Sequence, residues 1–189
     1  GKLEDYSLIQ AKGHFFSVYE LLSVKGSSHD TDYEGGSFIT IYLSPKDYHR
    51  FHMPASGTLA SGRYIPGALF SVNSTTVRGL KNLYVRNERY VADFVGDRCA
   101  FTLVAVGAMI VAGIETVWSG LVNSRESDRR LEESHFLENS VCLNQGQEAG
   151  RFRLGSTIIL LFPKNTLDWN EELRVGHRIK MGESLASWN

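Results

Sequence analysis

Cysteine is scarce in this chain, and neither sign of charge is in excess. Only Cys99 and Cys142 occur among 189 residues, too few for a disulfide framework or a cysteine-rich zinc site. Lys and Arg total 20 against 21 Asp and Glu, which gives a formal net charge of −1. General nucleic-acid binding needs an excess of positive charge to neutralise phosphates. The composition therefore excludes a disulfide-stapled small protein and argues against a nucleic-acid partner.

Long hydrophobic runs are missing as well. The longest apolar stretch, Phe101–Ile114, has 14 residues and is interrupted by Thr102, Gly107 and Gly113. A membrane-spanning helix needs about 20 predominantly apolar residues. The first ten residues are polar and lack the apolar centre of a signal peptide. We therefore expect neither a transmembrane helix nor a signal peptide in this sequence.

What is present indicates one mainly β domain over residues 1–189. Hydrophobic residues make up 42% of the chain and aromatic residues 11%, enough to build a core. Short apolar or β-branched runs alternate with turn signals, which is typical of strands. We predict a mainly β (α+β) fold, a compact sandwich or barrel-like domain with a few short helices. The predicted strands are Phe38–Leu43, Leu83–Val85, Tyr90–Val95, Phe101–Val106, Met109–Val117 and Thr157–Phe162.

Helix signals are weaker than strand signals. His14–Leu22 could form two turns, and Ser44–Tyr48 starts with a serine followed by Pro45, a pattern typical of a helix start. The charge-rich stretch Ser124–Asn139 has little apolar periodicity. We expect it to be a long surface connection rather than part of the core.

One candidate site contains two histidines three residues apart. His49 and His52 lie in a segment that runs from Ser44 to Pro54, just after a predicted strand. A zinc site would need a third ligand, and the other four histidines show no paired spacing. The alternative is that both imidazoles simply hydrogen-bond to the backbone. Because the third ligand is missing, we predict no metal.

A second candidate site is the Gly155-Ser156 pair that precedes the apolar run Thr157–Phe162. Glycine leaves its carbonyl unshielded, so a serine hydroxyl beside it is placed for intramolecular attack if a base is near. The competing interpretation is an ordinary turn that opens a strand. Glu88 and Glu115 also lie beside apolar strands. Either could support a site, although pairing with arginine or capping a turn is the simpler interpretation.

Together these segments resemble phosphatidylserine decarboxylases. The most specific motifs are Tyr-His-Arg-Phe-His-Met-Pro at 48–54 and Leu-Gly-Ser-Thr at 154–157. The stretches that carry the resemblance keep the family's order: Gln10–His14, Tyr42–Pro54, Tyr64–Asn73, Asn87–Arg89, Val106–Ala108, Gly113–Trp118 and Gly150–Thr157.

The resemblance implies a precursor that cuts itself between Gly155 and Ser156, giving a β chain of residues 1–155 and an α chain of residues 156–189. Ser156 would become a covalent pyruvoyl (pyruvate) cofactor, which forms a Schiff base with phosphatidylserine and yields phosphatidylethanolamine and CO₂. By the same resemblance, His52 is the base that activates Ser156, and His49 serves decarboxylation. The family also implies a homodimer and a peripheral location at the cytoplasmic side of the cell membrane, or at the mitochondrial inner membrane.

One departure from the family leaves an alternative open. The cleavage histidine of the family is oriented by an aspartate in an upstream Asp-Gly motif, and no Asp-Gly precedes Gln10 here, because Asp5 is followed by Tyr6. Without an orienting carboxylate, self-cleavage should slow severely. The alternative is therefore an unprocessed or disarmed relative that binds phospholipid. A conventional serine hydrolase with Ser156 as nucleophile ranks below both.

Overall fold

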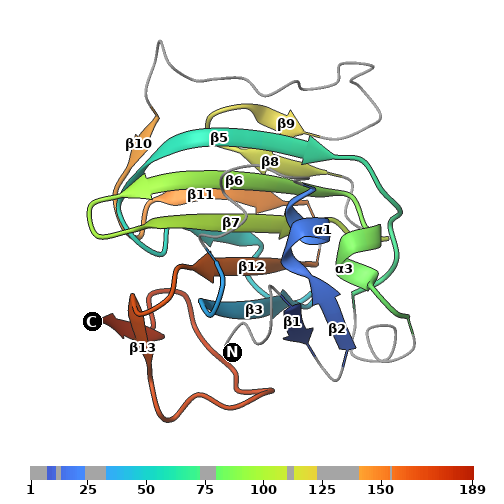
Figure 1. Cartoon of the computed structure of the whole chain (residues 1–189). Helices are drawn as coiled ribbons and strands as arrows, with labels where there is room; N and C mark the ends of the chain where they lie inside the picture. Colours follow the sequence, from blue (N-terminus) through green and yellow to red (C-terminus); the bar gives the residue numbers. More distant parts are fainter. Residues whose placement is uncertain are drawn as a thin grey trace.

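A computed structural model describes residues 8–11, 14–23, 33–72, 80–109, 113–122, 141–153 and 155–189. Strands dominate it, as Figure 1 shows, and the helices are short. The prediction of a mainly β fold with a few short helices is thus confirmed.

The larger of two central sheets has six strands in the order β10-β5-β6-β7-β12-β3, all antiparallel to their neighbours. In chain order these strands are β3 (Ser37–Leu43), β5 (Gly57–Ile65), β6 (Arg89–Gly96), β7 (Ala100–Val106), β10 (Cys142–Leu143) and β12 (Ser156–Phe162). All seven residues of β12 are buried, because the strand is covered on both faces and paired on both edges. The predicted strands 38–43, 90–95, 101–106 and 157–162 are confirmed within one residue at each end.

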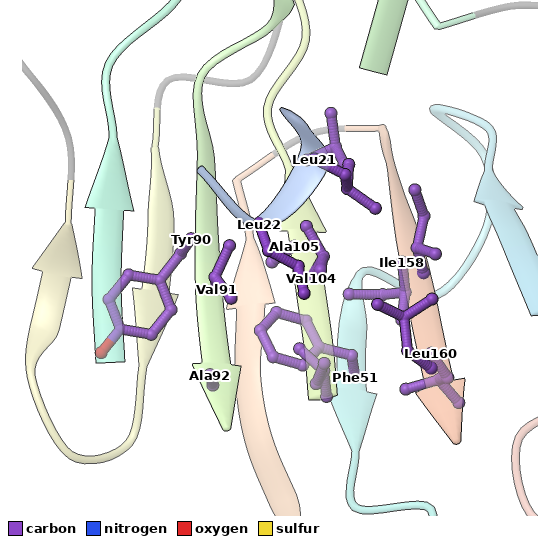
Figure 2. Packing of buried hydrophobic residues seen from close by; sticks show 14 of the residues in the cluster. Leu21, Leu22, Phe51, Tyr90, Val91, Ala92, Val104, Ala105, Ile158 and Leu160 are labelled. Atoms are coloured by element: carbon purple, nitrogen blue, oxygen red, sulfur yellow. The ribbon is translucent and has the colours of Figure 1, made fainter. Parts of the chain in front are cut away.

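The second sheet has four strands in the order β4-β11-β8-β9. They are β4 (Arg50–His52), β8 (Ile114–Thr116), β9 (Gly120–Val122) and β11 (Glu148–Phe152). Phe51 and Phe152 pack their rings 5.1 Å apart, centroid to centroid. Phe51 belongs to the same hydrophobic cluster as side chains of β6, β7, β12 and the helix α1 (Val18–Leu22), a grouping shown in Figure 2. One continuous core therefore joins the two sheets.

Smaller elements lie at the periphery. A two-stranded pair, β1 (Leu8–Ala11) and β2 (His14–Ser17), precedes α1. A second pair, β13 (Leu167–Trp169) and β14 (Ala186–Trp188), ends the chain. In the described part of the chain, no helix has the length and apolar character that crossing a bilayer requires.

Four predicted elements are wrong in type or extent. The predicted strand at Leu83–Val85 is the helix α3 (Leu83–Arg86), closed by bonds from the Arg86 and Asn87 amides to Asn82 and Leu83 carbonyls. A short apolar run does not distinguish strand from helix. Of the predicted helix His14–Leu22, only Val18–Leu22 is helical, because the first four residues pair with β1.

The third error is the helix predicted at Ser44–Tyr48, which is a single turn. The Asp47 carboxylate accepts a hydrogen bond from the Ser44 amide at 2.7 Å, and the Asp47 amide donates to the Ser44 carbonyl at 2.9 Å. The chain then enters β4 at Arg50, so no second turn forms. The fourth error is the predicted strand Met109–Val117: among its described residues only Ile114–Thr116 (β8) is a strand, and Met109 and Val117 lie in turns. Residues 110–112 and the predicted connection 124–139 lie outside the described residues.

Candidate active site at the start of β12

The Gly155-Ser156 peptide lies where β12 begins, beside the end of β3. Ser156 is 0% exposed, and its hydroxyl donates to the backbone carbonyl of Val106, the last residue of β7. A side chain at position 155 would meet the Leu43 carbonyl oxygen and the Pro45 nitrogen, each 3.2 Å from its Cβ. The close packing around Gly155 therefore favours glycine at this position.

A small cavity opens beside this peptide. It has a volume of about 30 Å³ and is lined by Tyr42, Pro45, Ser71, Val72, Ala108, Met109 and Gly155. Such a space holds a group about the size of a water molecule. Met109 is 66% exposed, so the lining reaches from the buried strand start to the molecular surface.

Pro45 links His49 to the Gly155-Ser156 peptide, because it contacts both. Its Nε2 is 3.2 Å from the Pro45 carbonyl oxygen, and Pro45 itself packs against Gly155. A carbonyl only accepts hydrogen bonds, so Nε2 carries the proton of the neutral imidazole. Nδ1 is then the basic nitrogen. It is buried, and it has no hydrogen-bond partner in the part of the chain that the structure describes.

His52 has the opposite arrangement of ring protons. Its Nδ1 is 2.9 Å from the Gly146 carbonyl oxygen and therefore carries the proton of the neutral ring. Its Nε2 is 3.1 Å from the Tyr48 hydroxyl, which donates to it. The Tyr48 and His52 rings also stack, with centroids 5.7 Å apart. The Gly146 carbonyl thus holds His52 with its lone pair on Nε2, the form that a general base needs.

These contacts bring part of the predicted site together. Gly155, Ser156 and His49 gather around the end of β3 and Pro45. Among the described residues, no hydrogen bond joins the Ser156 hydroxyl to His49 or His52. That hydroxyl is directed toward Val106. The same residues contain no group of three or more His, Cys, Asp and Glu side chains that could hold a metal ion.

Asn87, Glu88 and Arg89 form a buried polar segment whose importance sequence reasoning understated. All three are at most 3% exposed. Glu88 accepts a hydrogen bond from the Tyr64 hydroxyl at 2.9 Å. The sequence signal is three consecutive polar residues between apolar runs, a pattern equally typical of a surface turn. Glu115, by contrast, follows the simpler interpretation. Arg151 hydrogen-bonds to it and holds the pKa of its carboxyl below the ordinary value.

Arg89 is a structural clamp. Its guanidinium donates to the carbonyl oxygens of Glu20 at 2.7 Å, Leu21 at 2.6 Å and Val85 at 2.6 Å. These carbonyls belong to the last turns of α1 and α3, where a cation also interacts favourably with the helix dipole. Burial lowers the pKa of Arg89 to about 10. One side chain thus ties two helices to the first residue of β6.

Comparisons with known proteins agree with the sequence resemblance. Residues 1–187 match the sequence model of the family described as "Phosphatidylserine decarboxylase". The chain is similar to proteins named "Phosphatidylserine decarboxylase proenzyme" from three bacteria. Identity is 45% with that of Herminiimonas arsenicoxydans, covering 98% of this chain and 63% of the relative. It is 47% with that of Pseudomonas fluorescens strain Pf0-1, covering 100% and 66%, and 48% with that of Stutzerimonas stutzeri, covering 98% and 62%. The chain thus spans just under two thirds of the length of these relatives.

Proposed function

Because the chain belongs to the phosphatidylserine decarboxylase family, we propose that it converts phosphatidylserine to phosphatidylethanolamine and CO₂ with a pyruvoyl group made from Ser156. The observation that carries the proposal is the Gly155-Ser156 peptide. Its serine is buried at the start of a central strand, its glycine is closely packed by Leu43 and Pro45, and a cavity adjoins it. An ordinary turn that opens a strand needs neither the buried serine nor the cavity.

Self-cleavage uses the atoms of this peptide. The Ser156 hydroxyl oxygen attacks the Gly155 carbonyl carbon, the C–N bond breaks, and the proton passes to the Ser156 nitrogen, leaving an ester. Loss of the Ser156 α-proton then expels the Gly155 carboxylate and leaves dehydroalanine. Hydrolysis with one water releases ammonia and leaves the pyruvoyl group. The products are a β chain that ends at Gly155 and an α chain that begins at residue 156.

The residues around position 156 fit such a group. The three-carbon unit stays at the start of β12, and the cavity lined by Pro45, Ala108 and Gly155 adjoins it. When formed, the group supplies a ketone that holds the substrate amine and accepts the electrons released as CO₂ leaves. The protein contributes position, a buried environment and proton transfer.

The two histidines divide the proton transfers in this proposal. His52 acts as the base for Ser156, because the Gly146 carbonyl leaves its Nε2 unprotonated. This step requires the Tyr48 hydroxyl to leave Nε2 and the Ser156 hydroxyl to turn away from the Val106 carbonyl that it contacts here. His49 serves decarboxylation, by returning a proton to the substrate carbon that loses CO₂. Its Nδ1 is buried and unprotonated, and its Nε2 contacts the carbonyl of Pro45, the residue that packs against Gly155.

The wider setting follows from the substrate. A phospholipid substrate requires work at a membrane surface, so we propose a peripheral membrane protein with paired α and β chains, acting as a homodimer. The exposed Met109 beside the cavity is suited to contact with lipid.

Intact-mass measurement under denaturing conditions tests the proposal. Self-cleavage releases a fragment that begins at residue 156, and residues 156–189 account for about 3.8 kDa of the 21.1 kDa chain by residue proportion. The fragment's N-terminus should resist Edman degradation, because a pyruvoyl group has no amine. The Ser156→Ala variant serves as the control and should stay uncut. An uncut wild-type protein would contradict the proposal and favour an unprocessed lipid-binding relative.

A further inference from the structure

Glu88 is a buried carboxylate for which the proposed reaction has so far given no task. It is 3% exposed and precedes β6 directly. Burial of a carboxylate is costly unless its surroundings compensate it. The role of Glu88 therefore depends on the groups that its side chain covers.

The sheet register places one glycine between Glu88 and Ser156. Val106 is opposite Arg89 on one side and opposite Thr157 on the other. Antiparallel pairing carried one residue further puts Gly107 opposite both Glu88 and Ser156. The Gly107 amide donates to the Glu88 carbonyl at 2.8 Å, which supports this register. Directly opposed residues lie on one face of a sheet. Glu88 and Ser156 therefore share a face, with only a glycine between them.

The Glu88 side chain occupies the space that a side chain at 107 would fill. A Cβ built on Gly107 would lie 2.7 Å from Glu88 Cγ and 2.9 Å from its Oε1. The Tyr64 hydroxyl holds the far carboxylate oxygen at 2.9 Å. The Glu88 side chain therefore packs against the backbone of Gly107. This glycine follows Val106, whose carbonyl accepts the hydrogen bond from the Ser156 hydroxyl.

Asn87 fixes the same backbone from its other side. Its Nδ2 donates to the carbonyl oxygens of Gly107 and Phe70, both at 2.8 Å, and its Oδ1 accepts from the Phe70 amide at 3.0 Å. The segments that follow Phe70 and Gly107 supply four lining residues of the cavity beside Gly155. The Asn87-Glu88 pair thus joins two walls of the candidate site.

We propose that Glu88 is a positioning residue for self-cleavage: it lies over Gly107 and fixes the end of β7, and so holds in place the Gly155-Ser156 peptide that pairs with this end. The inference rests on the proposed function. Displacement of a reacting atom by about 1 Å can cost a factor of about 100 in rate. Loss of the contact between the Glu88 side chain and Gly107 should therefore slow the first step, ester formation, without unfolding the protein.

Hydroxylamine separates the first step from the later ones. It cleaves the ester between Gly155 and Ser156 and leaves a free serine amine, which Edman degradation detects. In the intact protein, Glu88→Ala should lower the rate of hydroxylamine-induced cleavage by about tenfold or more. Glu88→Gln keeps the shape and can still accept from Tyr64, so it should return the rate to within about threefold of wild type. Circular dichroism and urea unfolding establish that each variant is folded.

A double-mutant cycle tests the contact between Glu88 and Gly107. Gly107→Ala should slow hydroxylamine-induced cleavage much as Glu88→Ala does, because its Cβ takes the same space. Added to Glu88→Ala, it should cost less than about twofold more, since interacting positions are not additive. The matched control is Asp93→Asn, a second carboxylate on β6 that is bonded to other residues. It should leave the cleavage rate of the folded protein unchanged.

Four results would overturn the inference. The first is Glu88→Ala cleaving at the wild-type rate, and the second is full recovery of its rate by hydroxylamine, which would place the defect after ester formation. The third is a loss that merely follows the unfolded fraction, and the fourth is simple additivity with Gly107→Ala. If the wild-type protein itself stays uncut, with and without hydroxylamine, the proposed function fails rather than this inference.

Discussion

The two ends of the six-stranded sheet each hold a carboxylate of the β6 segment, but they hold it differently. Asp93 accepts hydrogen bonds from Ser61 and Thr102 at 2.6 Å and from the Arg63 guanidinium at 2.8 Å, and the Tyr33 hydroxyl lies 2.5 Å from the Thr102 hydroxyl. Glu88 accepts a hydrogen bond from Tyr64 and lies over the backbone of Gly107, near a cavity and a buried serine. Bonds between side chains thus dominate the Asp93 end. Contacts of side chains with backbone, at Gly107 and Phe70, dominate the Ser156 end.

This difference separates stability from chemistry along one sheet. A saturated network of charged and hydroxyl groups fixes a single arrangement. A peptide that must rearrange needs room and an exposed carbonyl, which glycine supplies. We therefore expect substitutions at the Asp93 end to change the free energy of unfolding, and those at the Ser156 end to change cleavage. Single substitutions at the two ends test that division.

Ser156→Ala should abolish cleavage altogether while costing about 1 kcal/mol or less of unfolding free energy, the usual contribution of one hydrogen bond. Intact mass should show one uncut chain, and urea unfolding should show a near-normal midpoint. Cleavage that persists at the same peptide in this variant would rule out Ser156 as the attacking group.

His52→Ala should slow cleavage by about 100-fold or more, the usual contribution of a general base. The time course of the fragment that begins at residue 156, followed by mass spectrometry, measures this. His177→Ala is the matched control, because His177 lies exposed in a C-terminal turn. A wild-type rate in His52→Ala would remove His52 from the proposed mechanism.

Asp93→Ala should destabilise the protein by about 2–4 kcal/mol, because it leaves the partly buried Arg63 guanidinium without its partner. Urea unfolding measures the loss. The exposed Asp97, in the turn that follows β6, offers the control, and Asp97→Ala should change stability by less than about 0.5 kcal/mol. If the folded Asp93→Ala protein also cleaved much more slowly than wild type, the division between the two ends would not hold.

Tyr84→Phe should change the response to alkaline pH. Burial raises the pKa of Tyr84 to about 12 from 10.0, so the folded state keeps a proton that the unfolded state loses. Its contribution is complete below pH 10 and disappears as the pH rises to about 12, a loss of about 2–3 kcal/mol. Between pH 10 and pH 12 the unfolding free energy of the variant should therefore fall by about 2–3 kcal/mol less than that of the wild type. Arg89, whose lowered pKa has the opposite effect above pH 10, is common to both proteins and cancels. Equal declines in the two proteins would contradict the prediction.

Arg151→Ala should have the smallest effect. The side chains of Arg151 and Glu115 are 44% and 27% exposed, and water and salt screen ion pairs at the surface. Urea unfolding should show a small shift of the midpoint at low salt and a smaller one at high salt. A large shift that persists at high salt would mean that the second sheet depends on this pair.

Much of the fold could be predicted from the sequence. The continuous apolar run at Thr157–Phe162 indicated a strand covered on both faces, and β12 is such a strand. Short segments could not be assigned in the same way. Leu83–Val85 has strand-like composition, yet the backbone bonds of its flanking asparagines make it helical. Likewise, a carboxylate three residues from Ser44 closed a turn where the sequence pattern predicted a helix.

The site was only partly predictable. The motifs indicated His49, His52, Gly155 and Ser156, and the structure places His49 and Gly155 against Pro45, with Ser156 beside the end of β3. The neutral rings of His49 and His52 carry their protons on opposite nitrogens, because one ring contacts the Pro45 carbonyl and the other the Gly146 carbonyl. The spacing of the two histidines in the sequence contains no such information. Glu88 was named as a residue that could support a site, but the sequence could not place it beside Ser156. That relation exists only through the pairing register of β6, β7 and β12.

The central position of β12 has a consequence for what the cut protein becomes. Cleavage before Ser156 would turn one folding unit into a complex of two polypeptides, with a strand of the shorter chain inserted between β7 and β3 of the longer. Dissociation would expose a fully apolar strand and two unpaired sheet edges, which invite aggregation. Reassembly would be bimolecular, so apparent stability would depend on protein concentration. Maturation would thus be a one-way step: the precursor can refold after denaturation, and the mature enzyme cannot readily do so.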